Sequence, residues 1–126
     1  MYAASVSIND LYYLVGATLK RMQRSESGAL TDAQASAANE SAWGCVKHAL
    51  DVCIVANTGN AECQDALFLQ SIHGDFEDNL VLAAARSIGA DYLVTSDEKL
   101  LMHSPVGALS PTVMSGLLAA EDVHRA

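Results

Sequence analysis

Apolar residues recur along the chain at two spacings, which predict an alternation of helices and strands. A spacing of three to four residues gathers side chains on one helix face, whereas short continuous apolar runs are typical of buried strands. The first pattern predicts helices at Ile8–Met22, Ala35–Leu50, Ala61–Ile72, from the cap at Asp75 to Ile88, from Pro111 onward, and one short turn at Glu98–Met102. The second pattern predicts strands at Tyr2–Val6, Val52–Val55, Tyr92–Thr95 and Val106–Leu109.

Polar residues at the ends of these segments support their boundaries. Ser7–Asp10 and Thr31–Gln34 have the spacing of capping boxes, in which side chains satisfy the free N–H groups of a first turn. Asp75 has the position of an N-cap, which places Asp78 in the first turn of the following helix. Gly89 ends that helix, because glycine readily adopts the left-handed conformation of a helix C-terminus.

The order of these elements predicts an α/β fold, a three-layer α/β/α sandwich with a parallel, Rossmann-like sheet. The length of 126 residues suits a single domain that covers residues 1–126. In parallel sheets, ligands bind outside the carboxyl ends of the strands, where the next helices begin. Asp10 and Asp78, both expected in first helical turns, and Asp97, just past a strand, are therefore expected to face one crevice.

Composition narrows the function classes. The net charge of −8 argues against passive binding to nucleic-acid phosphates, although it does not exclude an enzyme that contacts phosphates through metal ions. The three cysteines, Cys45, Cys53 and Cys63, show no CxxC spacing and indicate buried thiols in a reducing, cytoplasmic compartment. No apolar run has the length of a membrane span and no signal peptide is expected, so no membrane contact is predicted.

The aspartates support two interpretations. Several carboxylates in one crevice repel one another unless a cation binds, and Mg²⁺ or Mn²⁺ prefers such hard oxygen ligands. Water held by these ions can supply the nucleophile for phosphodiester hydrolysis. The alternative is plain helix capping, with Asp75 as an N-cap, Asp10 and Asp78 as first-turn acids, and Asp97 as the cap of the turn at Glu98.

The segment Asp75–Ser110 resembles the C-terminal half of a PIN domain, of the PilT N-terminus or VapC-like kind. The shared motifs are Asp75-Phe-Glu-Asp78-Asn-Leu, Gly89-Ala-Asp-Tyr-Leu-Val-Thr95-Ser-Asp97 and Leu109-Ser-Pro111, and Ser5–Leu14 resembles the segment with the family's second acid. The resemblance implies an Mg²⁺- or Mn²⁺-dependent ribonuclease, often the toxin of a toxin–antitoxin pair. It implies metal-site acids at Asp10, Asp78 and Asp97, with Asp75 as a candidate auxiliary ligand.

The chain also departs from the PIN pattern. The family's first strand, which ends in Asp-x-Asn or Asp-x-Ser, and the helix after it have no counterpart, and Met1 falls where the second strand is expected. Asp10 stands in place of the usual Glu, and Ser96 where a basic residue is common. Three explanations stay open: a start upstream of Met1, a separate chain that supplies the strand, or a truncated relative that dimerises and has lost activity.

The missing first strand affects which partners and which function we expect. Open sheet edges invite association, so we expect a homo-oligomer or a partner that supplies the strand, with an antitoxin as one candidate. RNA is the expected substrate of an active enzyme. The alternatives are a catalytically inactive PIN-like module that acts through protein contacts, and a small-molecule binder on a flavodoxin-like sheet, which lacks the expected phosphate loop.

Basic residues near the end of the first predicted helix and the four histidines are weaker candidates for function. Lys20, Arg21 and Arg24 are candidates for RNA contact, but they also suit the dipole at the C-terminal end of a solvated helix. The four histidines lack the spacing of metal ligands, which favours surface or turn positions. They are His48, His73, His103 and His124.

Overall fold

The computed structural model describes the backbone of residues 1–125 and the side chains of residues 1–122, in two compact units. Unit 1 covers Met1–Asn57, and unit 2 begins at Thr58. The single domain expected for residues 1–126 stays a prediction, because two compact units can belong to one domain.

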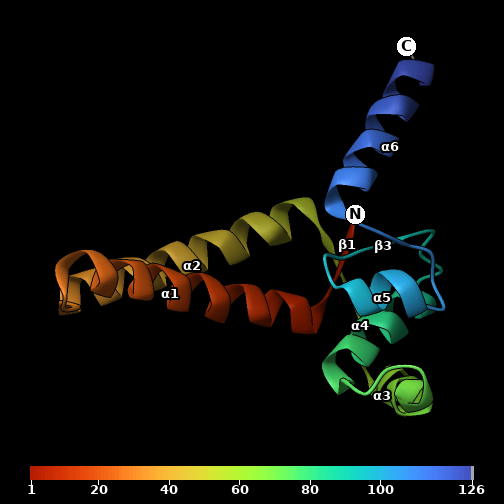
Figure 1. Ribbon diagram of the computed structural model, residues 1–126, viewed down its shortest axis with the longest axis horizontal. Coiled ribbons are helices and arrows are strands. Elements are labelled where there is room, and N and C mark those ends of the chain that lie inside the picture. The colour runs from red at the N-terminus through yellow and green to blue at the C-terminus, as the bar shows by residue number, and fades with distance from the viewer. Residues whose placement is uncertain (126) are drawn as a thin grey trace. The chain divides into compact units, whose positions relative to one another are not determined.

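The elements of unit 1 are β1 (Tyr2–Ala4), α1 (Ser5–Ser27), α2 (Asp32–Val52) and β2 (Ile54–Ala56) (Figure 1). Those of unit 2 are α3 (Asn60–Phe68), the 3-10 turn η1 (Leu69–Ser71), α4 (Phe76–Ser87), β3 (Leu93–Val94), α5 (Glu98–His103), β4 (Ala108–Leu109) and α6 (Pro111–Arg125).

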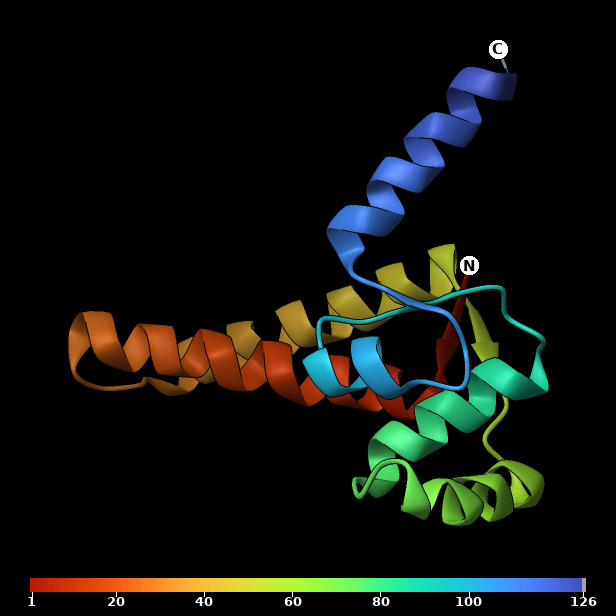
Figure 2. The ribbon, with the colours of Figure 1, turned by 45° about the vertical axis from the view of Figure 1, so that its right-hand side comes forward.

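The two long helices of unit 1 lie side by side and antiparallel (Figure 1, Figure 2). Small residues let them approach, since a Cβ atom on Gly16 would lie 3.9 Å from the Cβ atom of Ala42. Ala38 and Ala42 are the buried residues of α2. The rings of Tyr12 and Trp43 add an aromatic contact, with 5.0 Å between their centroids.

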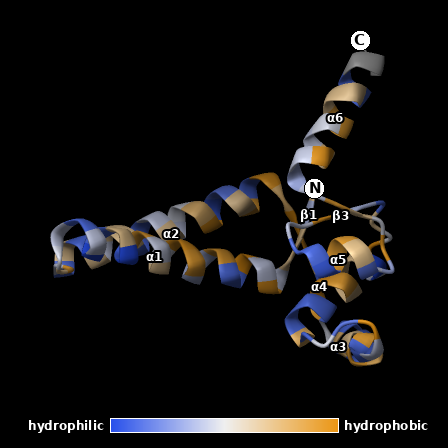
Figure 3. Ribbon diagram, viewed as in Figure 1, coloured by the Kyte–Doolittle hydropathy of each residue, from blue (hydrophilic) through white to orange (hydrophobic). Residues whose placement is uncertain are grey.

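Capping groups build the turn between α1 and α2. Gly28 has a φ of 75°, a left-handed conformation that favours glycine, and its N–H donates to the carbonyl of Arg24. The predicted capping box is confirmed: the N–H of Gln34 donates to Oγ1 of Thr31, and the N–H of Thr31 donates to Oε1 of Gln34. Hydrophilic residues gather at this end of the helix pair (Figure 3).

At the other end of the helix pair, β1 and β2 form a parallel two-stranded sheet, with Tyr2 opposite Ile54. The parallel strand predicted at Val52–Val55 forms but begins two residues later, at Ile54, and the prediction that it is buried is wrong. The helix α2 extends through Val52, and the side chains of Ile54 and Val55 are 61% and 40% exposed. Within the described residues no third strand pairs with β1 or β2.

Unit 2 is organised around leucines from three elements. Leu69 of η1, Leu82 of α4 and Leu100 of α5 form the hydrophobic cluster, and Leu93 of β3 packs against it. Leu82 has no exposed surface. The helix α3 packs against α4, and β3 pairs with β4 in parallel (Figure 2).

The predicted three-layer α/β/α sandwich is wrong. The order of the elements agrees with the sequence prediction, but helices account for 70% of the residues and strands for only 8%. The strands form two separate parallel sheets, β1–β2 and β3–β4. Strands of two or three residues make few ladder hydrogen bonds, and they cover too little area to form a layer between two layers of helices. The chain is mostly helical, with two small parallel sheets.

The helix α1 begins earlier than the sequence predicts. Its first residue is Ser5, and its N-cap, Ala4, makes no side-chain hydrogen bond. The capping box expected at Ser7–Asp10 is therefore wrong, and so is the first-turn position expected for Asp10, which lies exposed in the second turn. The physical reason is that β1 runs directly into α1 and leaves no loop in which a polar cap could act.

The cysteines are less buried than predicted. Cys63 is exposed, whereas Cys45 and Cys53 are half-buried, and all three are free thiols. None of the helices between residues 1 and 125 combines the length and the apolar character that a membrane crossing requires.

Candidate metal site

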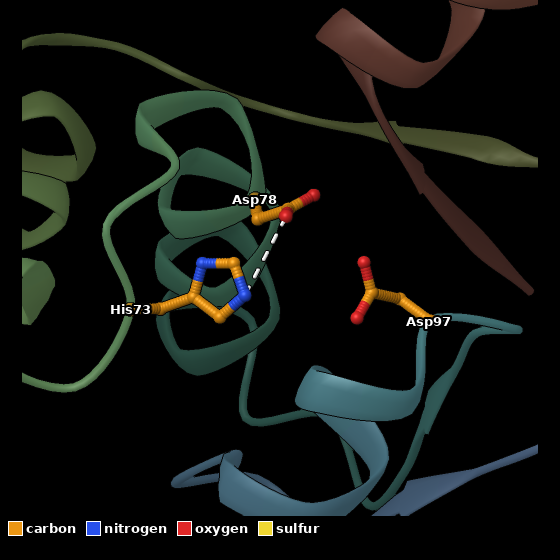
Figure 4. Close-up of side chains that lie close together, drawn as sticks. All are labelled: His73, Asp78 and Asp97. Atoms are coloured by element: carbon orange, nitrogen blue, oxygen red, sulfur yellow. Dashed lines mark ion pairs between the residues drawn. The ribbon is translucent and has the colours of Figure 1, made fainter.

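Three side chains from separate segments of unit 2 meet at one place. His73 follows η1, Asp78 lies in the first turn of α4, and Asp97 is the N-cap of α5. One candidate ligand atom from each side chain lies within 4.8 Å of the other two. The imidazole and the two carboxylates face a common space (Figure 4). The positions predicted for Asp78 and Asp97, in a first helical turn and just past a strand, are confirmed.

The leucine core sets the spacing of the two aspartates. Leu82 lies four residues after Asp78, and Leu100 lies three residues after Asp97. Residues three or four apart share a helix face, so each leucine lies on the same face as its aspartate. Because Leu82 and Leu100 meet in the hydrophobic cluster, their packing carries the two carboxylates to the same side of unit 2.

Two of the predicted metal-site acids are also helix caps. The N–H of Asp78 donates to Oδ1 of Asp75 at 2.9 Å. The N–H groups of Lys99 and Leu100 donate to Oδ1 of Asp97, at 2.8 and 3.2 Å. The capping interpretation is therefore confirmed for Asp75 and Asp97. Both of these bonds to Asp97 use Oδ1, so capping leaves Oδ2 to a cation.

His73 is buried and anchored at this site. Its side chain is 8% exposed, its Nδ1 accepts from the N–H of Asp75 at 3.3 Å, and its carbonyl accepts from Nδ2 of Asn79 at 2.8 Å. Two buried polar atoms here, Nε2 of His73 and Oδ1 of Asn79, have no hydrogen-bond partner. Nε2 lies 3.7 Å from Oδ2 of Asp78, which is within ion-pair distance when the imidazole is protonated but too far for a hydrogen bond. Buried polar atoms normally have partners, so these two point to a ligand.

The electrostatic field of the site is negative. Burial raises the pKa of Asp78, repulsion from Asp75 and Asp97 raises it further, and His73 and Lys99 act in the opposite direction. Four carboxylates and one ammonium group line the hollow at this site. A bound cation would relieve the repulsion between the carboxylates. The residues that line the hollow are His73, Asp75, Asp78, Asp97, Glu98 and Lys99.

The carboxylates fit a hard divalent cation. Mg²⁺ binds oxygen ligands at about 2.0–2.1 Å in octahedral geometry, so two oxygens on one ion lie roughly 3–4 Å apart. The candidate ligand atoms of Asp78 and Asp97 lie within 4.8 Å of each other, close to this separation. Two carboxylates leave most positions of the ion to water or to a substrate, as is usual for Mg²⁺.

Other predicted site residues lie in unit 1. Asp10 is exposed on α1, and the cluster of candidate ligands among the described residues does not include it. Lys20, Arg21 and Arg24 lie near the C-terminal end of α1, with Arg24 in the last turn, where a cation suits the helix dipole. Their contact with RNA stays a prediction.

His73 and Asn79 are site residues that were not predicted from the sequence. The spacing between the histidines carries no signal, whereas the spacing of His73 to the acids that follow it, His73-x-Asp75-x-x-Asp78, does. Asn79 is 2% exposed and lies three residues before Leu82. A polar residue at an otherwise apolar face position was the signal for a buried hydrogen bond.

The chain matches no protein-family model, no curated protein and no solved structure. The resemblance of its motifs to PIN domains therefore stays a prediction.

Leu100→Ala tests whether the core positions the aspartates. Loss of this side chain, 3% exposed, should lower the free energy of unfolding by about 2–5 kcal/mol and weaken cation binding at Asp97. Met102→Ala in the same helix is the control, because Met102 is 76% exposed and its loss should cost less than about 0.5 kcal/mol. Thermal denaturation with and without Mn²⁺ measures both effects. An undiminished metal response in Leu100→Ala would show that the core does not set the site.

Proposed function

We propose that this chain binds a divalent cation, Mg²⁺ or Mn²⁺, at Asp78 and Asp97 and acts as the metal-dependent endoribonuclease that its PIN-like motifs imply. One observation carries the proposal: carboxylates from two helices meet beside buried polar atoms that lack a partner. A cation at this place supplies Lewis acidity, because it polarises phosphoryl oxygens and lowers the pKa of coordinated water.

The chain's own residues hold and orient the site. Asp78 and Asp97 supply the oxygen ligands. Asp75 acts through position and charge, since its bond to the N–H of Asp78 holds the first turn of α4 and its carboxylate strengthens the attraction for a cation. In this proposal Asp75 is an auxiliary group of the site, and Asp10 is not needed to complete the pair of ligands.

RNA as the substrate rests on the motifs and on the charge of the hollow. Its four carboxylates repel a phosphodiester unless a cation lies between them, which supports a metal-dependent reaction. Lys20, Arg21 and Arg24, near the C-terminal end of α1, are candidates for contact with RNA phosphates. They lie far from the acids of the hollow in the sequence. A cytoplasmic location, consistent with three free thiols, and an antitoxin partner belong to the same proposal.

Metal binding is tested by melting the protein after EDTA treatment. Mn²⁺ should stabilise the wild type by about 2.7 kcal/mol at a hundred times its dissociation constant. Asp97→Asn should abolish this response but keep the fold, because asparagine also caps helices well. Asp78→Asn should abolish it too and melt no earlier than the wild type without metal, since its neutral amide replaces a carboxylate whose pKa burial raises. Asp122→Asn, the same charge change at an exposed position of α6, should keep the full response. No response in the wild type would rule out the site.

Ribonuclease activity is tested with a mixed-sequence RNA in the presence of Mn²⁺. Cleavage should require the metal and should fall by at least ~100-fold in Asp78→Asn. Equal rates in the wild type and Asp78→Asn would assign the cleavage to a contaminant. A metal response without cleavage would leave a metal-binding protein that is not a nuclease.

A second candidate function, a protein-contact module, is favoured by exposed apolar residues in unit 1. No further strand of the described chain pairs with β1 or β2, and Met1, Tyr2, Ile54 and Val55 are between 40% and 83% exposed. Open strand edges with apolar side chains favour pairing with another chain. We propose a second copy of this chain as the occupant, because identical open edges can pair about a two-fold axis.

Light scattering at micromolar concentration tests this association. The mass should be at least twice the 13.3 kDa of one chain. Ile54→Lys, which adds a charge to the exposed face of β2, should reduce the mass to that of a single chain. Leu67→Lys is the control, because Leu67 is 60% exposed on α3 in unit 2. A wild-type protein that scatters as a single chain would contradict the proposal.

A further inference from the structure

We infer that His73 donates a hydrogen bond from Nε2 to a phosphoryl oxygen of the bound ligand, and that it is not a third metal ligand. The inference rests on the proposed cation site of Asp78 and Asp97. It adds the residue that would bind the phosphoryl group beside the cation, whether that group belongs to the proposed RNA substrate or to free phosphate.

The hydrogen bond between Asp75 and His73 assigns the tautomer. Nδ1 lies 3.3 Å from the backbone nitrogen of Asp75, and a backbone N–H can only donate. Nδ1 must therefore offer a lone pair, and the neutral imidazole carries its proton on Nε2. A metal ligand needs a lone pair, and histidines that bind metal through Nε2 usually donate Nδ1–H to an oxygen. His73 shows the reverse arrangement.

The Nε2–H group faces the site but reaches no acceptor. Nε2 is buried without a hydrogen-bond partner and lies 3.7 Å from Oδ2 of Asp78. The imidazole edge with Nε2 faces the Asp78 carboxylate (Figure 4). The residue is held on its other side by the bonds to Asp75 and Asn79, which oppose a movement that would close the gap. A ligand oxygen next to Nε2 would satisfy a donor that makes no hydrogen bond within the protein and whose contact with Asp78, the dashed line in Figure 4, is an ion-pair contact of 3.7 Å.

The charges around Nε2 of His73 indicate which kind of ligand oxygen would accept its hydrogen bond. The hollow contains four carboxylates and a single ammonium group, that of Lys99, so an anion enters only together with a cation. A divalent ion between Asp78 and Asp97 keeps positions for phosphate oxygens. A charged phosphate oxygen also accepts a stronger hydrogen bond than a neutral one does. A phosphoryl group can bind the cation through one oxygen and accept the hydrogen bond from Nε2 of His73 through another. It therefore satisfies both the charge of the hollow and the free donor.

His73→Asn and His73→Gln are the matched variants for a test. Asparagine places an oxygen near the position of Nδ1, where it can accept from the N–H of Asp75, and has no group at the position of Nε2. Glutamine reaches further and can place an amide N–H near the position of Nε2. Circular dichroism and melting in EDTA establish that both variants fold.

Binding is then measured by isothermal titration, first with Mg²⁺ and then with inorganic phosphate at saturating Mg²⁺. Both variants should bind Mg²⁺ within about threefold of the wild type. Phosphate affinity should fall about tenfold or more in His73→Asn and less in His73→Gln, as expected for the loss of a charge-assisted hydrogen bond. Phosphate should bind to none of the proteins in EDTA.

Two results would overturn the inference. If His73→Asn loses Mg²⁺ binding as Asp97→Asn does, His73 is a metal ligand. If His73→Asn binds Mg²⁺ and retains full phosphate affinity, His73 only positions Asp78. A wild type that binds neither Mg²⁺ nor Mn²⁺ would end the proposed function and this inference together, whereas the first two results leave the metal site in place.

Two-bond ¹H–¹⁵N correlation spectra of the histidine rings provide a readout that does not depend on affinity or activity. The signal of His73 is assigned by its absence in His73→Asn. We expect Nε2 to carry the proton both in EDTA and with Mg²⁺ bound. A proton on Nδ1 in the metal-bound protein would overturn the inference, because Nε2 would then offer its lone pair to the ion.

Discussion

The packing of Leu82 against Leu69 and Leu100 is the contact on which unit 2 and its site depend. Leu82 is fully buried, and the elements that meet around it carry the candidate site at their ends. The loop after η1 holds His73, the first turn of α4 holds Asp78, and the start of α5 holds Asp97. An apolar contact thus determines the distance between charged groups that would repel each other in the absence of a cation.

Capping and cation binding are compatible uses of the same aspartates. Asp97 caps α5 through Oδ1, and Asp75 caps α4 through Oδ1, so each carboxylate is oriented by backbone N–H groups. A carboxylate fixed in this way loses less freedom when it binds an ion. The two interpretations that the sequence left open, helix capping and metal binding, therefore do not exclude each other. Asp78, which burial and neighbouring acids make costly to ionise, gains most from a cation.

Much of the local structure could be predicted, whereas the architecture could not. The order of the elements, the capping box at Thr31 and the N-cap at Asp75 follow from residues a few positions apart. The sandwich prediction failed because apolar runs such as Val52–Val55 indicate strand character without fixing strand length or pairing partners. The first-turn position of Asp10 failed because periodicity does not locate the start of a helix that lacks a polar cap.

The candidate site could also be predicted from the sequence only in part. The sequence by itself determined that Asp78 lies in a first turn and that Asp97 follows a strand, because helix starts and strand ends depend on neighbouring residues. Only the tertiary structure decided that His73 joins them and that its Nε2 is buried without a partner. Burial and hydrogen bonding at His73 depend on Asn79 and on the packing of η1, α4 and α5 around one leucine cluster. The hydrogen bonds of His73 are local, but its burial and its closeness to Asp97 depend on packing between separate segments, which residue spacing does not reveal.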